Sequence, residues 1–237
     1  MKTVLTSVGV LALTSLTACG SEAGDPPAQQ DFDHGTVVNT GTGGGGNVTE
    51  PPFLQYAYPT APFGSQIDSV IAPLTLLGWK APIDAQFDTA ALEPVTIADF
   101  YNPDGKKPWK LIWVNSSAVW CGPCNKEYAE MRDSDTFKQV LEPKGVAVIG
   151  TLMENISAGP AAPSDLKNWG DKYKVPFPLA LDPAFKMGQY FEQATVPGAI
   201  LVDAKTMKIV AKLSGGAVAG PGGVLEEIDA ALANLPQ

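Results

Sequence analysis

Cysteine and histidine are scarce in this sequence. Among its 237 residues there are three cysteines and one histidine. Protein sites for zinc and similar metals are built from clusters of these two residue types. The single histidine, His34, lies in a segment rich in Gly, Pro, Ser and Thr, where an isolated imidazole is normally hydrated. We therefore expect no bound metal, and nothing in the sequence indicates a cofactor.

The sequence also lacks an excess of positive charge. It has 16 Lys and Arg against 25 Asp and Glu, which gives a formal net charge of −9. Nucleic-acid binding and polybasic membrane attachment require the opposite balance, so neither is expected. Hydrophobic residues make up 45% and charged residues 17% of the chain, which is typical of a globular protein.

The N-terminal hydrophobic run is too short for a comfortable transmembrane helix. It extends from Val4 to Leu16, whereas a bilayer requires about 20 apolar residues. Together with Lys2 it matches a secretory signal. Residues 16–19 read Leu-Thr-Ala-Cys and resemble a bacterial lipobox, which predicts a signal peptide at residues 1–18 and lipid attachment to Cys19. The alternative is an ordinary signal peptide with an unpaired cysteine nearby.

Two further regions follow the predicted signal peptide. Residues 19–62 are rich in Gly, Pro, Ser, Thr, Asn and Asp, a composition typical of a flexible tether. Residues 63–237 alternate β-type and helical patterns, which predicts one α/β domain.

The pattern predicts particular strands and helices within this domain. The expected strands are Val95–Ile97, Lys110–Val114, Val146–Gly150, Ala199–Val202 and Lys208–Leu213. The expected helices are Gly122–Leu141, Asp165–Tyr173 with Ser164 as its cap, Pro183–Phe191 after Asp182, and Val224–Leu235.

The most informative motif is WCGPC at residues 120–124. It follows an apolar run and precedes a polar, charged one, which predicts the order strand, tight turn, helix. This order places Cys121 at a helix N-terminus, where the helix dipole and free N–H groups stabilise a thiolate. With Cys19 assigned to lipid, Cys121 and Cys124 have only each other as partners. A purely structural disulfide is disfavoured, because so small a loop adds little stability.

These residues carry a family resemblance. WCGPC is identical to the thioredoxin active-site motif, and Thr195-Val196-Pro197 resembles the cis-proline loop that faces it. Asn115, Glu127 and the insertion after Gly150 are similar to the extracytoplasmic TlpA/ResA branch, grouped with the redoxin or AhpC/TSA-like domains. The resemblance implies a thioredoxin-like fold, with a central mixed β-sheet flanked by helices.

The resemblance also implies roles for the two cysteines and their turn. Cys121 is expected to be the nucleophile and the more exposed thiol, with Cys124 as the resolving thiol. Gly122 and Pro123 are expected to tune the reduction potential, and this Gly-Pro pair is typical of reducing proteins.

Four neighbouring residues complete the predicted site. Glu127 is expected to handle the proton of Cys124, unless it is a solvated acid in the first turns of a helix. Trp120 is expected to shield the sulfurs and contact substrate, unless it is a core aromatic. Pro197 is expected to follow a cis peptide, which leaves the backbone of Val196 free to pair with substrate; the alternative is a trans proline entering a strand.

The predicted function is that of a lipid-anchored, extracytoplasmic thiol-disulfide oxidoreductase on the periplasmic side of a bacterial membrane. Its partners would be protein disulfide or thiol substrates and a membrane thiol electron donor. One alternative is a peroxiredoxin-like thiol peroxidase, but the Thr of the Thr-x-x-Cys motif of such enzymes is replaced by Ala118. Another is a non-catalytic binding lipoprotein with this fold. The substrate and the choice between inner and outer membrane are not predicted.

Overall fold

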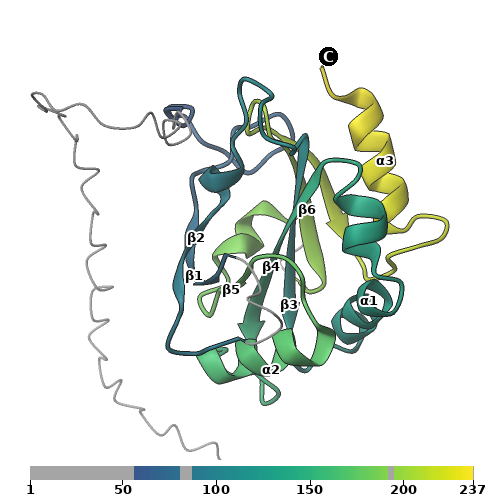
Figure 1. The fold of residues 1–237 in the computed structure, drawn as a ribbon. Helices are drawn as coiled ribbons and strands as arrows, with labels where there is room; N and C mark the ends of the chain where they lie inside the picture. The colour runs from purple at the N-terminus through teal and green to yellow at the C-terminus, as the bar shows by residue number, and fades with distance from the viewer. Residues whose placement is uncertain (1–55, 81–86, 192–194, 237) are drawn as a thin grey trace, which may run out of the picture. The chain divides into compact units, whose positions relative to one another are not determined.

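One mixed sheet forms the centre of the protein. The computed structural model describes residues 56–80, 87–191 and 195–236. Seven strands follow the spatial order β2-β1-β5-β4-β3-β6-β7 (Figure 1). Their bounds are β1 Thr75–Trp79, β2 Glu93–Thr96, β3 Leu111–Ala118, β4 Val146–Glu154, β5 Leu179–Leu181, β6 Gly198–Asp203 and β7 Ile209–Ser214.

The sheet combines parallel and antiparallel pairing. The strands β3, β4 and β5 are mutually parallel neighbours, whereas β6 lies antiparallel to β3 and to β7. On the other side, β1 pairs antiparallel with both β5 and β2. The predicted central mixed β-sheet is therefore confirmed.

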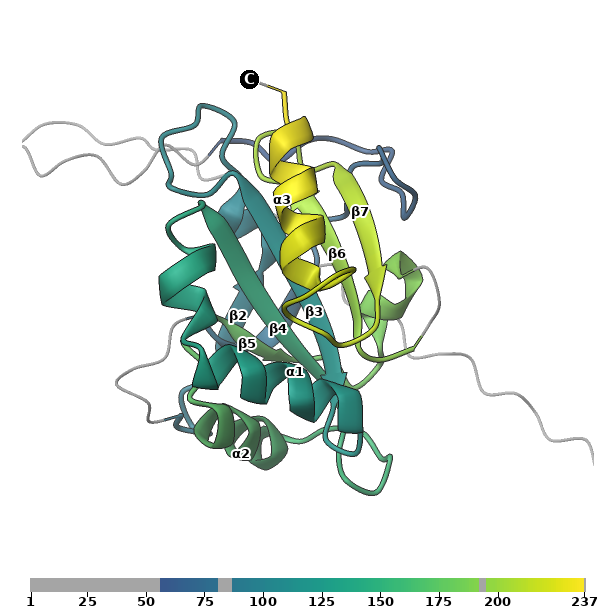
Figure 2. The same cartoon turned by 90° about the vertical axis from the view of Figure 1, so that its right-hand side faces the viewer.

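The central strand β3 is buried on both faces. Leu111 and Trp113 belong to the core beneath the helices α1 (Gly122–Asp133), α2 (Pro163–Tyr173) and α3 (Val224–Asn234). Ile112 and Val114 face the second core, which short 3₁₀-helices and the segment before β1 cover. Figure 2 looks onto the face that carries the three α-helices. A strand enclosed in this way reads as a continuous apolar run.

The helix expected over Gly122–Leu141 is two separate elements. The first, α1, ends at Asp133, and a π-helical turn spans Phe137–Leu141. Between them Asp135 has a φ of 44°, a left-handed conformation that interrupts a right-handed helix. The prediction of one continuous helix was therefore wrong.

Two other helix predictions need correction. The N-cap of α2 is Ala162 rather than Ser164, and the Ala162 N–H donates to the Asp165 carboxylate over 2.9 Å. The segment expected as the helix Pro183–Phe191 contains only the 3₁₀-helix Lys186–Tyr190. It begins after Phe185, whose φ of 47° prevents an earlier helical start.

Parts of the predicted organisation lie outside the described residues, including Cys19, His34 and the chain as far as residue 55. Where the described chain begins, Tyr58 donates to the Ile71 carbonyl over 2.8 Å and packs against Tyr101. Within the described residues, none of the helices has the length and apolar character needed to cross a bilayer.

Candidate active site

The turn between β3 and α1 (residues 119–121) and the first turn of α1 form the candidate redox turn. Cys121 is the N-cap of α1, and its Sγ accepts a hydrogen bond from the Cys124 N–H over 3.1 Å. The first turn of α1 carries no acidic residue. The positive end of the helix dipole is therefore not offset there, which favours a thiolate at Cys121.

The two cysteines form a disulfide in this structure. The Cys121–Cys124 S–S distance is 2.10 Å, and their Cα atoms are 5.3 Å apart. Cys121 is 2% exposed and Cys124 is fully buried. Cys121 is thus only marginally more exposed than Cys124, and both cysteines are buried in this oxidised state. Trp120, Gly122 and Pro123 are the exposed residues of the turn.

A buried acid lies one helical turn after Cys124. The Glu127 side chain is buried, and its Oε1 accepts a hydrogen bond from Asn115 Nδ2 on β3. Among the described residues, Glu127 Oε2 has no hydrogen-bond partner. Burial is the main cause that raises the pKa of Glu127 to about 8; the Asn115 hydrogen bond opposes this and the charge of Glu130 adds to it. The alternative of a solvated acid is wrong.

Trp120 is not a core aromatic. Its side chain is 46% exposed, and its Nε1–H donates to the Glu154 carboxylate over 2.6 Å. Glu154 is the last residue of β4, and its carbonyl accepts from the Val119 N–H over 2.9 Å. Glu154 at the end of β4 therefore holds Val119 through its backbone carbonyl and Trp120 through its side chain.

Pro197 lies close to the redox turn, across the Gly216 backbone. The Val196–Pro197 peptide is cis, as expected. A Cβ placed on Gly216 would lie 3.0 Å from both the Pro123 carbonyl oxygen and Pro197 Cγ, so the Gly216 backbone fits between these two prolines. Val196 is half-buried and precedes β6, whose pairing starts at Gly198.

Sequence reasoning missed two polar residues of α1 that tie the turn to distant segments. The Asn125 side chain contacts both the redox turn and α2. The Glu130 carboxylate accepts from the Val218 N–H over 3.2 Å, which fixes the segment that follows Gly216. Both are ordinary polar positions of a helix in the sequence, and their partners on distant segments are 47 or more residues away.

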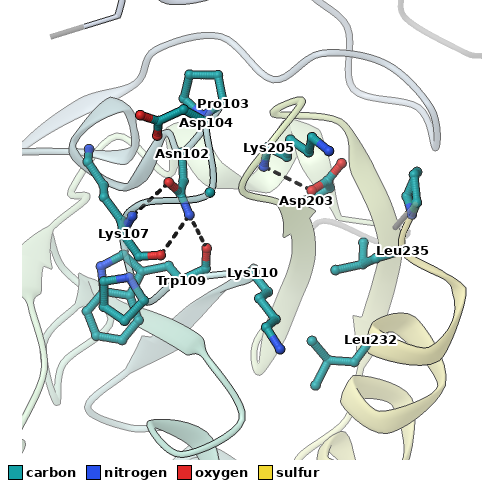
Figure 3. A pocket seen from close by; sticks show the side chains of 13 residues that line it. Asn102, Pro103, Asp104, Lys107, Trp109, Lys110, Asp203, Lys205, Leu232 and Leu235 are labelled. Atoms are coloured by element: carbon teal, nitrogen blue, oxygen red, sulfur yellow. Dashed lines mark hydrogen bonds between the residues drawn. The ribbon is translucent and has the colours of Figure 1, made fainter. Parts of the chain in front are cut away.

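A hollow of about 470 Å³ lies far from the sulfurs, at the opposite end of β3 (Figure 3). The loop before β3, the β6–β7 turn and the end of α3 line it. At its rim, the Asn102 side chain bonds to the backbone of Lys107 and Trp109. In the described part of the chain, no group of three or more His, Cys, Asp and Glu residues could hold a metal ion.

The comparisons with known proteins agree with this geometry. Residues 77–212, more than half of the chain, match the AhpC/TSA family. The chain belongs to the AhpC/TSA family. A relative, the thiol-disulfide oxidoreductase ResA of Bacillus cereus, is 28% identical over 106 residues. That match covers 45% of this chain and only 56% of the relative's own length.

A solved structure shares the fold. An uncharacterised conserved protein of Geobacillus kaustophilus superposes with a TM-score of 0.51 at 17% identity, covering 73% of this chain and 85% of that one. A protein of Chlorobium tepidum, provisionally described as the thiol:disulfide interchange protein DsbE, gives a TM-score of 0.49 at 19% identity, over 70% of this chain and 98% of that one. The fold is the α/β, thioredoxin-like fold that the sequence predicts.

Proposed function

We propose that this protein is a thiol-disulfide oxidoreductase that reduces disulfides of extracytoplasmic proteins. The single observation that supports this most is the Cys121–Cys124 disulfide at the N-terminal end of α1, beside a buried Glu127. A helix N-terminus favours the thiolate that thiol-disulfide exchange requires. The name of the Bacillus cereus relative agrees with this chemistry.

The proposed reaction starts from the reduced pair. The Cys121 thiolate attacks one sulfur of the substrate disulfide; a new S–S bond forms, the substrate bond breaks, and the departing thiolate takes up a proton. Cys124 then loses its proton and attacks Cys121 Sγ, which releases and reduces the second substrate sulfur. Two electrons have then passed to the substrate, and the pair is left as the disulfide of this structure.

Glu127 is the proposed proton acceptor for Cys124. The two residues are three apart on α1, so their side chains lie on the same face of the helix. Because burial raises the pKa of Glu127 to about 8, its carboxyl can both accept and release a proton near neutral pH. Its unpartnered Oε2 is the oxygen available for this exchange.

The proposed substrate contacts surround the exposed part of the turn. Trp120 offers a large exposed ring, of the kind enriched where proteins bind each other. Val196 lies just before the paired part of β6, so its backbone can hydrogen-bond with an extended substrate segment. Pro197 places this segment beside Pro123, with the Gly216 backbone between them.

The proposed location is the periplasmic side of a bacterial membrane. The lipobox-like residues 16–19 support lipid attachment to Cys19, and residues 19–62 would tether the domain at residues 63–237. A membrane protein with its own thiol pair would return two electrons to the Cys121–Cys124 disulfide after each cycle.

A trapping experiment tests the function. In Cys124→Ser the resolving thiol is absent, so we expect this variant to accumulate mixed disulfides between Cys121 and its substrates, which non-reducing gels and mass spectrometry would identify. The double variant Cys121→Ser/Cys124→Ser is the control and should capture nothing. Equal activity of this control and the wild-type protein in a protein-disulfide reduction assay would refute the proposal.

The same preparation tests the peroxidase alternative. The chain belongs to the AhpC/TSA family. However, the position three before Cys121, where the peroxidase motif has a threonine, is occupied by the buried Ala118, which has no hydroxyl. We expect hydrogen peroxide to be consumed no faster than by an ordinary thiol. Rapid peroxide turnover with a thioredoxin-type donor would favour the alternative.

A further inference from the structure

The Asn125 side chain makes four hydrogen bonds, the full capacity of a carboxamide with two N–H donors and two oxygen lone pairs. Its Nδ2 donates to the Val119 carbonyl over 3.0 Å and to the Cys121 carbonyl over 2.7 Å. Its Oδ1 accepts from Lys172 Nζ over 2.8 Å and from the Tyr173 hydroxyl. One side chain therefore connects the redox turn with the end of α2.

The donor side of the carboxamide fixes the backbone around the reactive sulfur. Val119 and Cys121 lie on either side of Trp120, and both carbonyls point to the same Nδ2. The Cys121 carbonyl also accepts the Asn125 N–H over 3.0 Å as part of α1. Two bonds to one carbonyl hold the N-cap residue in the orientation that directs its Sγ toward the Cys124 N–H.

The acceptor side brings a positive charge to the same carboxamide. Lys172 also lies 4.8 Å from the centre of the Tyr173 ring, a cation–π distance. Tyr173 is buried and packs edge-on against Trp169. The Tyr173 hydroxyl and the Lys172 ammonium therefore approach Asn125 from the same end of α2. Arg132 on α1 bonds to the Lys172 carbonyl over 3.2 Å.

The other charged groups on the elements around the turn are mostly engaged elsewhere. Glu154 bonds to Trp120, and Lys126 pairs with Glu130, which also binds Val218. Glu127 is buried against Asn115. Among the described residues, Lys172 is thus the cation whose hydrogen bonds lead through a single side chain to the backbone of Cys121.

We propose that Asn125 is a positioning residue for the redox turn, and that through it Lys172 and Tyr173 of α2 favour the thiolate form of Cys121. The oriented carboxamide has its oxygen toward the ammonium and its N–H groups toward the turn. This arrangement extends the positive end of the α1 dipole. The inference rests on the proposed function, in which Cys121 is the attacking thiolate, but it concerns a measurable property of that thiol.

The test uses the full chain in a Cys124→Ser background. The rate of iodoacetamide alkylation of the Cys121 peptide is measured by mass spectrometry across pH. Lys172→Met should shift the pH midpoint of alkylation upward and slow the reaction at pH 7 about twofold to fivefold. Tyr173→Phe should give a smaller shift in the same direction. Asn125→Asp should give the largest shift, because it removes the donors and adds a negative charge.

The matched control is Lys174→Met, which removes the same charge from an exposed residue two positions further along. It should alkylate like the parent protein. Because Lys172 is exposed, Lys172→Met should fold even if Asn125→Asp does not, and thermal unfolding of each variant monitors this. If Lys172→Met and Tyr173→Phe leave the alkylation profile unchanged, the inference is refuted.

The alkylation test and the test of the proposed function can fail independently of each other. Alkylation requires no substrate, so a shifted profile in a protein that reduces no disulfide would refute the proposed function alone. An unshifted profile in an active reductase would refute the role of Asn125 alone.

Discussion

Buried polar groups near the two ends of β3 differ in how completely they are hydrogen-bonded. Before the strand begins, the Asn102 side chain accepts from the Lys107 N–H over 3.0 Å and donates to the Lys107 and Trp109 carbonyls over 2.9 and 2.7 Å (Figure 3). After the strand ends, Glu127 accepts one bond from Asn115, and its second oxygen has no partner among the described residues.

This difference distinguishes a polar group that stabilises the fold from one that can take part in proton transfer. A buried carboxamide with its bonds satisfied contributes stability and does not titrate. A buried carboxyl with an unsatisfied oxygen costs stability whenever it is charged, and that cost raises its pKa into the neutral range. The fold therefore retains at the redox end a group that is unfavourable for stability, and this is expected where a proton must move.

The strongest way to test the comparison is to remove the carboxyl of Glu127 with Glu127→Gln. Its pKa is about 8 in the folded chain and 4.5 in its unperturbed state. Between these values the folded chain binds more protons than the unfolded chain, so the wild-type free energy of unfolding falls as pH rises through this window. We expect the free energy of unfolding of Glu127→Gln to lack this fall. Relative to the wild-type value, it should therefore rise by roughly 1 kcal/mol per pH unit across this window.

Urea unfolding of both proteins in the oxidised state, at several pH values from 5 to 8, measures the effect. The control is Glu142→Gln, an exposed acid beyond the π-helical turn, which should show the wild-type slope. A Glu127→Gln profile parallel to wild type would mean that the Glu127 carboxyl titrates at an ordinary pH, and the contrast between the two ends of β3 would then disappear.

The complementary change is Asn102→Leu at the structural end. It leaves the Lys107 N–H and two backbone carbonyls without their present partner. Because an unpaired group near the interior costs about 1–3 kcal/mol, we expect a loss of about 2–3 kcal/mol in the free energy of unfolding, independent of pH. The disulfide reduction rate per folded molecule should be unchanged.

Asn168→Leu is the matched control, since Asn168 is exposed on α2. It should alter stability by less than about 0.5 kcal/mol. A slower reaction of folded Asn102→Leu would show that the two ends of β3 are coupled, and would contradict their separation into structural and chemical roles.

The redox turn could be predicted because its signals are local. An apolar strand, a CxxC turn and a polar helix follow one another within residues 111–133. The end of α1 was misjudged because Asp135 adopts a left-handed conformation, and the sequence there lacks the Gly or Asn that usually occupies such a position at a helix end. The strands β1 and β5 were missed because they are five and three residues long and form through pairing with distant segments.

The contacts of the site were less predictable than its residues. Glu127 could be named from the family resemblance, but its burial depends on β3 packing beneath α1. Asn125 gave no signal at all, because its partners on α2 are 47 and 48 residues away. Periodicity and spacing describe one element at a time, whereas these bonds depend on how two elements meet.

The smallest effect is expected at the surface of the redox end, where Trp120 donates to Glu154. Trp120→Phe removes this donor and keeps a large ring, and because both groups are partly exposed, the loss of stability should stay below about 1 kcal/mol. If Trp120 contacts substrate as proposed, the KM for a protein disulfide should rise while the reaction with a small aromatic disulfide stays at the wild-type rate. Glu154→Gln retains an acceptor for Nε1 and should behave like wild type in both assays. Equal slowing of the two substrates by Trp120→Phe would instead assign the indole to shielding of the sulfurs, and the redox end would then bind substrate without it.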